Sequence, residues 1–538
     1  MEFAGDAKGP FAVGRTVTDS KAVHGRVHLR LAPATAWWLV MAAITLVAAL
    51  IRLSHLGAES IWFDEASTWA ATRVPVKHFV RVLVEHEVSP PLYFVLMKGW
   101  TSVAGDSEVV LRLPSALVGT LTVLILGWLS RGVVGAGPAL AGSVLLALSP
   151  FHIWYSQEAR SYALYTFLIL LATIALAVAW ESNQRQAWLV YFLSLLAACY
   201  THYFAVYFLV AHASFVAVAS LSSVRTSLAH QLLLSRRRIW TVGTATVGVV
   251  FLPWLILKSP RHPWSGGNWI QQLWVNTAPL LQLWETTRSI FLGDWYPFAA
   301  RNWVHLGIII LIGGGMLPTL GKGNSNASGL RIGPMPLSTV VLVPSVVAWA
   351  VSQFWPSMIP RYLIPILPAA LILVGIGIWR IRSTALRVLV VSALAIGQIL
   401  SLQHQIREHM RPDVRGLSAY LRACAQPGDG LVVEEWYNTL VFRYYMRDTL
   451  PVVVDLLKVK RSSDHEKALE LQLAPLKRLW FVKIRNPGDE DTLRLYLDTH
   501  YPVTDIGEVF WQIQDVKLYS LAPGTPTGGN ACRGRGAG

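Results

Sequence analysis

Long apolar runs, separated by short polar segments, make up most of the first 400 residues of the chain. Eleven of these runs have the length of about 16–20 residues that a helix needs to cross a bilayer. Pro91–Trp100 is also apolar but too short to span, so it is predicted to form an interfacial or re-entrant helix. The pattern predicts a polytopic α-helical membrane protein with about eleven transmembrane helices. The eleven runs are Trp37–Arg52, Leu113–Leu129, Val133–Leu148, Tyr162–Trp180, Trp188–Tyr203, Phe204–Leu221, Ile239–Leu257, Trp303–Leu320, Leu337–Trp355, Tyr362–Trp379 and Ala385–Leu402.

Basic residues cluster in every second polar segment. With eleven spans these segments all fall on one side of the membrane, and the positive-inside rule assigns that side to the cytoplasm. Residues 1–34 are then a cytoplasmic basic tail. They are not predicted to be part of a cleaved signal, because the tail is long and no small-residue cleavage pattern follows the first run. The basic residues are Lys8, Arg15, Lys21, Arg26, Arg30, Arg131, Arg185, Arg225, Arg236, Arg237, Arg238, Lys322, Arg331, Arg380, Arg382 and Arg387.

The other polar segments are predicted to lie outside the cytoplasm. Residues 35–402 form the predicted transmembrane domain, and residues 54–112 form its first outside loop. After Gln403, strand-like and helical segments alternate, which predicts a small extracytoplasmic α/β domain over residues 403–522. The Gly-rich residues 523–538 are predicted to be disordered. The outside segments are Ser54–Arg112, Ser149–Ser161, Thr201–His202, Lys258–Asn302, Pro356–Arg361 and everything after Gln403.

The composition agrees with a lipid environment. The chain is 53% hydrophobic and only 14% charged, whereas soluble domains carry about 25% charged residues. The net charge of +15 does not indicate nucleic-acid binding, because no basic stripe lies on a soluble helix. Positive-inside topology and contact with anionic lipids account for it. The three cysteines match no metal-binding or redox spacing.

The first outside loop carries most of the candidate chemistry. Asp64 and Glu65 follow Trp62 close to the membrane, and His86 and Glu87 lie later in the same loop. A carboxylate at this place could take a proton from an acceptor hydroxyl, or hold a divalent metal on a phosphate. The alternative is that these are solvated loop acids with no chemical role.

Two further outside segments carry candidate residues. In the Tyr155–Tyr162 turn, Glu158 and Arg160 are two residues apart and would not share a helical face. They are therefore predicted to have different roles, or to form a helix cap and an interface anchor. Arg361 opens the tenth run. Its guanidinium fork suits a phosphate, although an arginine here could also simply extend to the membrane interface.

Taken together, these segments resemble the polytopic glycosyltransferases of the GT-C class. The nearest group is the PMT-2 or RgtA/B/C/D-like family, which is related to protein O-mannosyltransferases and to aminoarabinose transferases of lipid A. The resemblance covers most of the chain, and the order of the motifs on matching sides of the membrane makes it specific. The segments that carry it are Ile61–Glu65, Ser89–Phe94, Leu111–Ser115, Ser149–His152, Tyr155–Tyr162, Arg361–Pro365, Arg411–Asp413 and Pro427–Asp429.

The resemblance implies a sugar donor on a polyprenyl phosphate and a catalytic carboxylate after the first helix. That carboxylate is Asp64, with Glu65 beside it. The family often has His before Pro-Pro-Leu, whereas this chain has Ser89, so either His86 or Glu87 replaces it or no metal is used. A divalent metal held by Asp64 and Glu65 thus stays open. The remaining expected roles are donor phosphate binding by Arg361 and Arg160, and substrate or cation positioning by Glu158, His86, Glu87 and Tyr162.

The expected function is that of a multi-pass glycosyltransferase in the plasma (inner) membrane. Asp64 would act as general base in an inverting transfer to a lipid, glycan or protein acceptor. A flippase or transporter of lipid-linked sugars is the alternative, but it would need polar groups near mid-bilayer. The predicted helix centres are almost free of charge, which favours the enzyme. A scaffold whose C-terminal domain binds a partner would leave the Asp64 loop unexplained.

Overall fold

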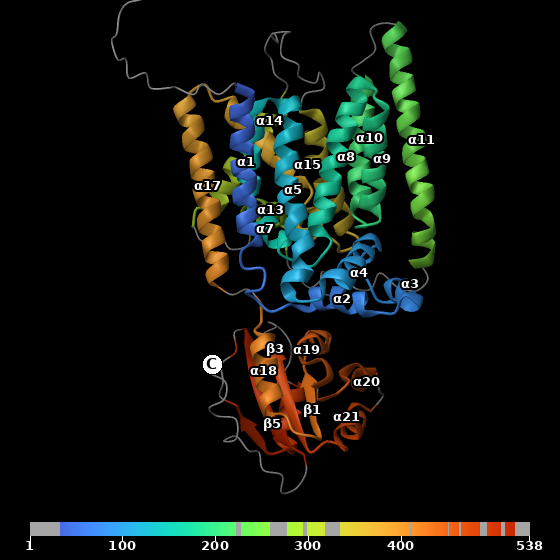
Figure 1. Ribbon diagram of the computed structural model, residues 1–538, viewed down its shortest axis with the longest axis vertical. Coiled ribbons are helices and arrows are strands. Elements are labelled where there is room, and N and C mark those ends of the chain that lie inside the picture. Colours follow the sequence, from blue (N-terminus) through green and yellow to red (C-terminus); the bar gives the residue numbers. More distant parts are fainter. Residues whose placement is uncertain are drawn as a thin grey trace, which may run out of the picture.

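Long helices form a bundle with short helices at one end and a mixed sheet beyond them (Figure 1). In this computed structural model most of the predicted N-terminal basic tail and the predicted disordered tail lie outside the described residues. So do Trp264, Trp269, Trp274 and Trp295 of the long fourth outside loop. The structure describes residues 33–221, 227–258, 277–293, 299–317, 334–408, 411–449, 451–461, 464–484, 492–506, 510 and 512–521.

Each of the eleven predicted runs overlaps a helix of the bundle. Six of the described helices are long and apolar enough to cross a membrane. Helices α6 (Ala136–Leu148) and α7 (Pro150–Ser156), which are bent relative to each other, make a seventh if the two form one span. Three others are apolar but shorter than 18 residues, so the number of eleven spans stays a prediction. The bundle helices are α1 (Pro33–Leu53), α5 (Glu108–Val134), α6 (Ala136–Leu148), α8 (Tyr162–Ser182), α9 (Arg185–Cys199), α10 (Ala205–Leu221), α11 (Ser227–Lys258), α14 (Arg301–Met316), α15 (Met335–Ser352), α16 (Ile366–Trp379) and α17 (Thr384–Arg407).

Helix α16 lies in the middle of the bundle and packs closely against its neighbours. Almost every one of its residues is buried. A Cβ atom on Gly375 would lie 2.4 Å from the carbonyl oxygen of Pro138 in α6, and one on Gly377 would lie 2.2 Å from that of Leu311 in α14. Small residues of this kind let helix backbones approach each other in a membrane, where apolar burial alone gives little driving force.

The first predicted outside loop folds into three helices at one end of the bundle. These are α2 (Phe63–Arg73), α3 (Val76–Glu85) and α4 (Leu92–Ala104), and they lie between the long helices and the C-terminal sheet (Figure 1). Helix α3 buries Phe79 and exposes Val80. Helix α4 contains most of the run that was predicted to form a short interfacial helix.

A bend of 61° separates α6 from α7 (Pro150–Ser156). Pro150 starts α7 and has no N–H to donate, so the last carbonyls of α6 need another partner. Arg52, at the end of α1, supplies it with hydrogen bonds to the carbonyls of Leu146 and Ala147, both at 3.0 Å. Gln157 in turn donates to the carbonyls of Ile51, Arg52 and Ser54. Arg52 therefore caps the C-terminal end of α6, and Gln157 caps the C-terminal end of α1.

Replacing Arg52 by Met is expected to destabilise the bundle. The carbonyl of Ala147 would lose the guanidinium donor, and that of Leu146 would keep only the N–H of Ser149 at 3.4 Å. An unsatisfied buried acceptor costs about 1–3 kcal/mol. Thermal unfolding in detergent should show a lower midpoint for Arg52→Met than for Arg382→Met, because Arg382 is exposed at the other end of the bundle. Equal midpoints for these two variants would show that the cap contributes nothing.

Beyond the short helices, the C-terminal unit (residues 411–521) is built on a five-stranded sheet of order β2-β1-β3-β5-β4. Strand β1 runs parallel to β2 and β3, whereas β5 is antiparallel to β3 and β4. The sequence has strand-like segments at Leu431–Glu435, Val452–Val454 and Leu479–Ile484, which correspond to β1, β2 and β3, whereas β4 and β5 were not predicted. The strands are β1 (Asp429–Val433), β2 (Val452–Val453), β3 (Arg478–Ile484), β4 (Val503–Asp505) and β5 (Ile513–Ser520), and the helices are α18 (Val414–Cys424), η3 (Trp436–Asn438), α19 (Thr439–Met446), η4 (Arg447–Thr449), α20 (Leu456–Arg461), α21 (His465–Leu473) and α22 (Thr492–His500).

The two faces of the sheet have separate apolar cores. One core joins α20, α21 and α22 to the sheet. The other contains Leu417 of α18 and Phe442 of α19, and it continues into the short helices through Ala66, Tyr93 and Leu111. The C-terminal unit and the first loop thus share one core, which positions α2 against the end of the bundle.

Candidate active site

Asp64 lies in the first turn of α2, at the end of the bundle that faces the C-terminal unit. Acidic residues are stabilised at this place by the partial positive charge of the helix N-terminus. Its Oδ2 atom is 3.3 Å from Nη1 of Arg361, and both side chains are 16% exposed. Arg361 belongs to η2 (Pro360–Leu363), nearly 300 residues away in the chain. The structure therefore brings together the predicted base and the predicted phosphate ligand, and leaves both accessible.

Glu65 has a different environment, although it is the next residue. It is completely buried. Arg112 of α5 donates to both of its carboxylate oxygens, each at 2.7 Å. The N–H of Ala159 donates to Oε1 at 3.0 Å, and Arg411 donates to Oε2 at 2.8 Å. Burial alone would raise the pKa of Glu65, but the charges of Arg112 and Arg411 outweigh it and hold the pKa at about 2.

The predicted Glu158–Arg160 turn lies directly beside these acids. Arg160 donates from Nη1 to the carbonyl of Asp64 at 3.3 Å, and lies 4.0 Å from Glu87. Glu158 is fully buried, and neither of its carboxylate oxygens has a hydrogen-bond partner among the described residues. Burial raises the pKa of Glu158 to about 8; Arg411 opposes this shift, and Asp64 adds to it. Glu158 is therefore largely neutral at pH 7.

The pH dependence of stability should reflect this proton. The native state holds it more tightly than the unfolded chain, in which a glutamate titrates near 4.5, so Glu158 lowers stability as the pH rises from about 4.5 to about 8. We expect the unfolding midpoint of Glu158→Gln to fall less than that of the wild type between about pH 6 and pH 9. The exposed Glu466→Gln serves as control. An identical decline in all three proteins would contradict the assignment.

Aromatic rings surround Arg361. Its guanidinium lies 5.8 Å from the ring centroids of Trp62, Tyr162 and Tyr362. Tyr162 is itself stacked on Tyr362, with centroids 6.4 Å apart. Rings at this distance attract a cation without neutralising it, so they hold the guanidinium and preserve its positive charge. Tyr162 lies beside this guanidinium, and its role in positioning a substrate or a cation stays a prediction.

The two other predicted positioning residues lie in different places. Glu87 is buried and accepts a hydrogen bond from Ser67 at 2.6 Å, and its backbone carbonyl accepts one from Lys258 at the end of α11. It therefore belongs to the cluster through Arg160. His86 is exposed at the C-terminal cap of α3, and its side chain has no partner from the cluster in the part of the chain that the structure describes.

The donor set does not suit a resident divalent metal. Over the described ranges, no group of three or more His, Cys, Asp and Glu side chains could hold an ion. Glu65 already has two arginine partners, and Asp64 faces Arg361. We therefore derive no step through a metal.

Two residues of the cluster had no assigned role in the sequence analysis. Arg112 and Arg411 stand in segments that carry the resemblance, but their spacing gave no indication that both would meet Glu65. The available signal was an arginine at the start of an apolar run and another directly before Pro412. Arg112 also donates to the carbonyls of Leu56, Glu59 and Ser60, so it ties the loop before α2 to α5.

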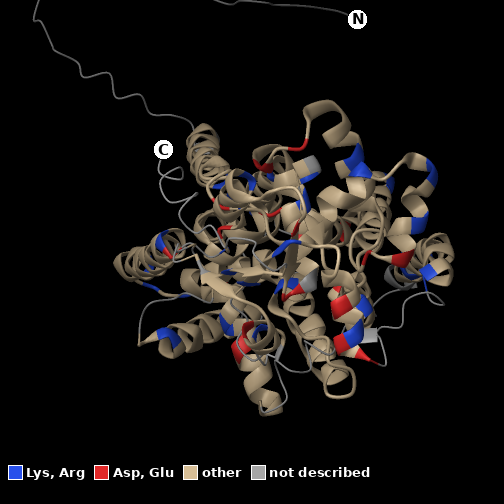
Figure 2. Ribbon diagram, turned by 90° about the horizontal axis from the view of Figure 1, so that it is seen from below, with Lys and Arg blue, Asp and Glu red and all other residues tan. Residues whose placement is uncertain are grey.

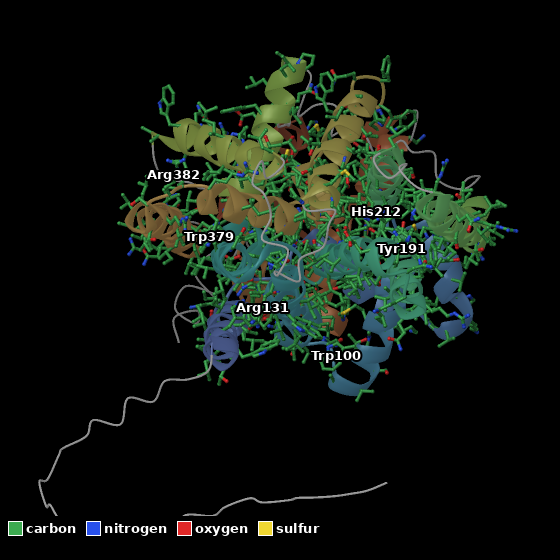
Figure 3. The ribbon with its side chains drawn as sticks, turned by 90° about the horizontal axis from the view of Figure 1, so that it is seen from above. Trp100, Arg131, Tyr191, His212, Trp379 and Arg382 are labelled. Carbon is green, nitrogen blue, oxygen red and sulfur yellow. The ribbon has the colours of Figure 1, made fainter. Side chains whose placement is uncertain are left out.

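Seen from the end that carries the C-terminal unit, basic and acidic segments are interspersed over the centre of the molecule (Figure 2). Figure 3 shows the opposite end, where Arg131, Trp379 and Arg382 are labelled. Arg131 lies in the last turn of α5 and over the ring of Trp37 at 4.5 Å. Arg131 and Arg382 belong to the basic segments that are predicted to lie in the cytoplasm.

Comparisons with known proteins fit this arrangement. Residues 88–256 match the family described as dolichyl-phosphate-mannose-protein mannosyltransferase. No curated protein matches the sequence significantly. The fold resembles that of ArnT from Cupriavidus metallidurans in the apo state, with a TM-score of 0.59, 13% identity, and coverage of 91% of this chain and 98% of ArnT.

Two further solved structures are similar. ArnT from the same organism bound to undecaprenyl phosphate has a TM-score of 0.57 at 13% identity, and the match covers 92% of this chain and 100% of that one. The oligosaccharyltransferase of Archaeoglobus fulgidus in complex with Zn and sulfate has a TM-score of 0.53 at 11% identity, covering 82% and 68%. The chain therefore shares the fold of ArnT, and its residues 88–256 are similar to the dolichyl-phosphate-mannose-protein mannosyltransferases, in agreement with the resemblance in its sequence.

Proposed function

We propose that the chain is a glycosyltransferase that moves a sugar from a polyprenyl phosphate to an acceptor hydroxyl on the extracytoplasmic face of the membrane. The observation that carries the proposal is the pairing of Asp64 with Arg361 at 3.3 Å, with both side chains partly exposed. A base next to a phosphate-binding cation is what transfer from a phosphosugar needs. The undecaprenyl phosphate bound by the similar ArnT supports a lipid-linked donor.

The reaction is written as one inverting displacement. The phosphate of the donor pairs with Arg361, which releases Asp64 to accept a proton from the acceptor hydroxyl. The acceptor oxygen forms a bond to the anomeric carbon while the bond from that carbon to the phosphate oxygen breaks. Polyprenyl phosphate leaves with the bonding electron pair, and the charge of Arg361 stabilises it.

The other residues of the cluster hold this pair in place. Glu65 acts as the anchor of α2 and not as a second base, because its hydrogen bonds come from arginines and from the backbone N–H groups of Trp62 and Ala159. Arg160 binds the backbone of Asp64 and adds positive charge behind the donor phosphate. Neutral Glu158 keeps a further negative charge away from an anionic substrate, and Tyr162 orients Arg361.

Reconstitution tests the proposal. Purified protein in liposomes that contain a radiolabelled polyprenyl-phosphate sugar is expected to release polyprenyl phosphate when a membrane extract from the organism supplies the acceptor. The labelled sugar should appear on an acceptor, and its anomeric configuration there should be opposite to that in the donor. Movement of the label across the bilayer without transfer would instead support a flippase, for which none of the comparisons gives support.

A further inference from the structure

Arg411 connects the C-terminal unit to the buried cluster. It lies between the end of α17 and the start of α18, and it is buried. Its Nη1 is 2.8 Å from Glu65, its Nε is 3.7 Å from Glu59, and its guanidinium lies 4.9 Å from the ring centre of Trp154 in α7. One side chain thus contacts the first turn of α2, the loop before it and the helix that leads to Glu158.

The C-terminal unit has other anchors on the same loop, and none of them contacts Glu65. Arg415 donates to the carbonyls of Gly57 and Ala58, each at 3.0 Å. Tyr445 accepts a hydrogen bond from the N–H of Ile61 at 2.7 Å and donates to Glu108. Together with the shared apolar core, these contacts hold the unit in place. The contact between Arg411 and Glu65 can therefore be removed without detaching the unit.

Burial of Glu65 does not require Arg411. Arg112 already binds both carboxylate oxygens, and one arginine fork neutralises one carboxylate. A second buried guanidinium carries a desolvation penalty that its ion pair offsets only in part. Arg411 instead fixes the orientation of the Glu65 carboxylate, because Oε2 receives hydrogen bonds from both Arg112 and Arg411. The orientation of this carboxylate in turn fixes the helix turn that carries Asp64.

We propose that Arg411 is a positioning residue of the transferase site, through which the C-terminal unit holds the first turn of α2 so that Asp64 faces Arg361. The C-terminal unit is then a working part of the active site and not a separate binding module. This inference rests on the proposed function. A misplacement of about 1 Å at a reacting group can cost about 10²-fold in rate, so a small rotation of this turn has a large effect.

The effect should also be visible in the pH profile. The charged groups that face Glu158 are Arg411, Asp64, Glu65 and Arg361. Arg411 lowers the pKa of Glu158, so its removal moves that pKa further up. The pH profile of wild-type activity should have a limb that reflects the titration of Glu158 and is absent from Glu158→Gln. Whether transfer needs the neutral or the charged form of Glu158, this limb should lie at higher pH in Arg411→Ala. A residue that places no charge near Glu158 would leave this limb in place.

The experiment compares Arg411→Ala, Arg411→Lys and the matched control Arg415→Ala as full-length protein in liposomes. We expect Arg411→Ala to lower kcat by about 10- to 100-fold with little change in the KM for the donor, and to shift the limb. Arg411→Lys should recover part of kcat and keep the limb, since it restores the charge. Arg415→Ala should resemble the wild type in both.

The outcomes separate the two proposals. If wild-type protein transfers sugar and Asp64→Asn does not, but Arg411→Ala has the kcat and pH profile of the wild type, the inference is wrong and the proposed function stands. If no variant affects transfer, or the wild type transfers nothing, the proposed function itself fails. Should Arg411→Ala not fold, Arg411→Lys decides: a lowered kcat at unchanged KM supports the inference, and a wild-type kcat overturns it.

Discussion

An Asp64→Asn variant is expected to lose about 10²- to 10⁴-fold in kcat, which is the usual contribution of a general base. Asparagine has nearly the same shape but cannot accept the proton of the acceptor hydroxyl. The KM for the donor should stay constant or fall, because the donor phosphate no longer competes with the Asp64 carboxylate, 3.3 Å away, for Arg361. Initial rates in liposomes at varied donor concentration measure both constants.

Glu85→Gln is the control for Asp64→Asn. Glu85 lies on the same loop and pairs with Arg81 at 2.9 Å, but this pair is on the exposed side of α3. Its kcat and KM should equal those of the wild type. A kcat of Asp64→Asn within threefold of the wild type would show that another group takes the proton, and would remove the mechanism proposed above.

Arg112→Met is expected to destabilise the protein by about 3–5 kcal/mol, the cost of leaving a buried charge without its main partner. Arg112 donates to both oxygens of Glu65 and to three backbone carbonyls. Its loss leaves Glu65 with Arg411 and the N–H of Ala159, and frees the loop before α2. Thermal or denaturant unfolding of the detergent-solubilised protein gives the change in stability.

A double variant distinguishes the ion pair from the other contacts of Arg112. In Arg112→Met with Glu65→Gln both members of the pair are removed, and Arg411 keeps Glu59 at 3.7 Å as its partner. The combined loss should therefore be smaller than the sum of the two single losses. Arg81→Met, at an exposed pair, should change stability by no more than about 0.5 kcal/mol. Strict additivity of Arg112→Met and Glu65→Gln would mean that the pair contributes no coupling energy.

The sequence predicted the helices of the bundle well, because a helix in lipid must be apolar over its whole length and such runs are easy to detect. It also placed Asp64, Arg160 and Arg361 on one side of the membrane. The contact between Asp64 and Arg361 could not be predicted from spacing, since nearly 300 residues separate them. Only the shared side and the family resemblance indicated it.

The different environments of Asp64 and Glu65 could not be predicted from the sequence. Neighbouring residues on a helix point in directions about 100° apart, so one can face the site while the other faces the core. The pattern showed two adjacent acids but not which arginines would meet them. Strands β4 and β5 were missed for a different reason. Strand β4 has only three residues, and β5 begins with half-buried and exposed positions, so neither forms a clear apolar run.

Sugar transfer on the extracytoplasmic face requires that Asp64 lies on that side of the membrane. Lys77, exposed on α3, and Arg382, exposed at the other end of the bundle, are replaced one at a time by cysteine in a protein whose three native cysteines are changed to serine. Intact cells are then treated with a membrane-impermeant maleimide. We expect Lys77→Cys to be labelled in intact cells and Arg382→Cys to be labelled only after the membrane is opened. The reverse pattern would place Asp64 in the cytoplasm and contradict transfer on the outer face.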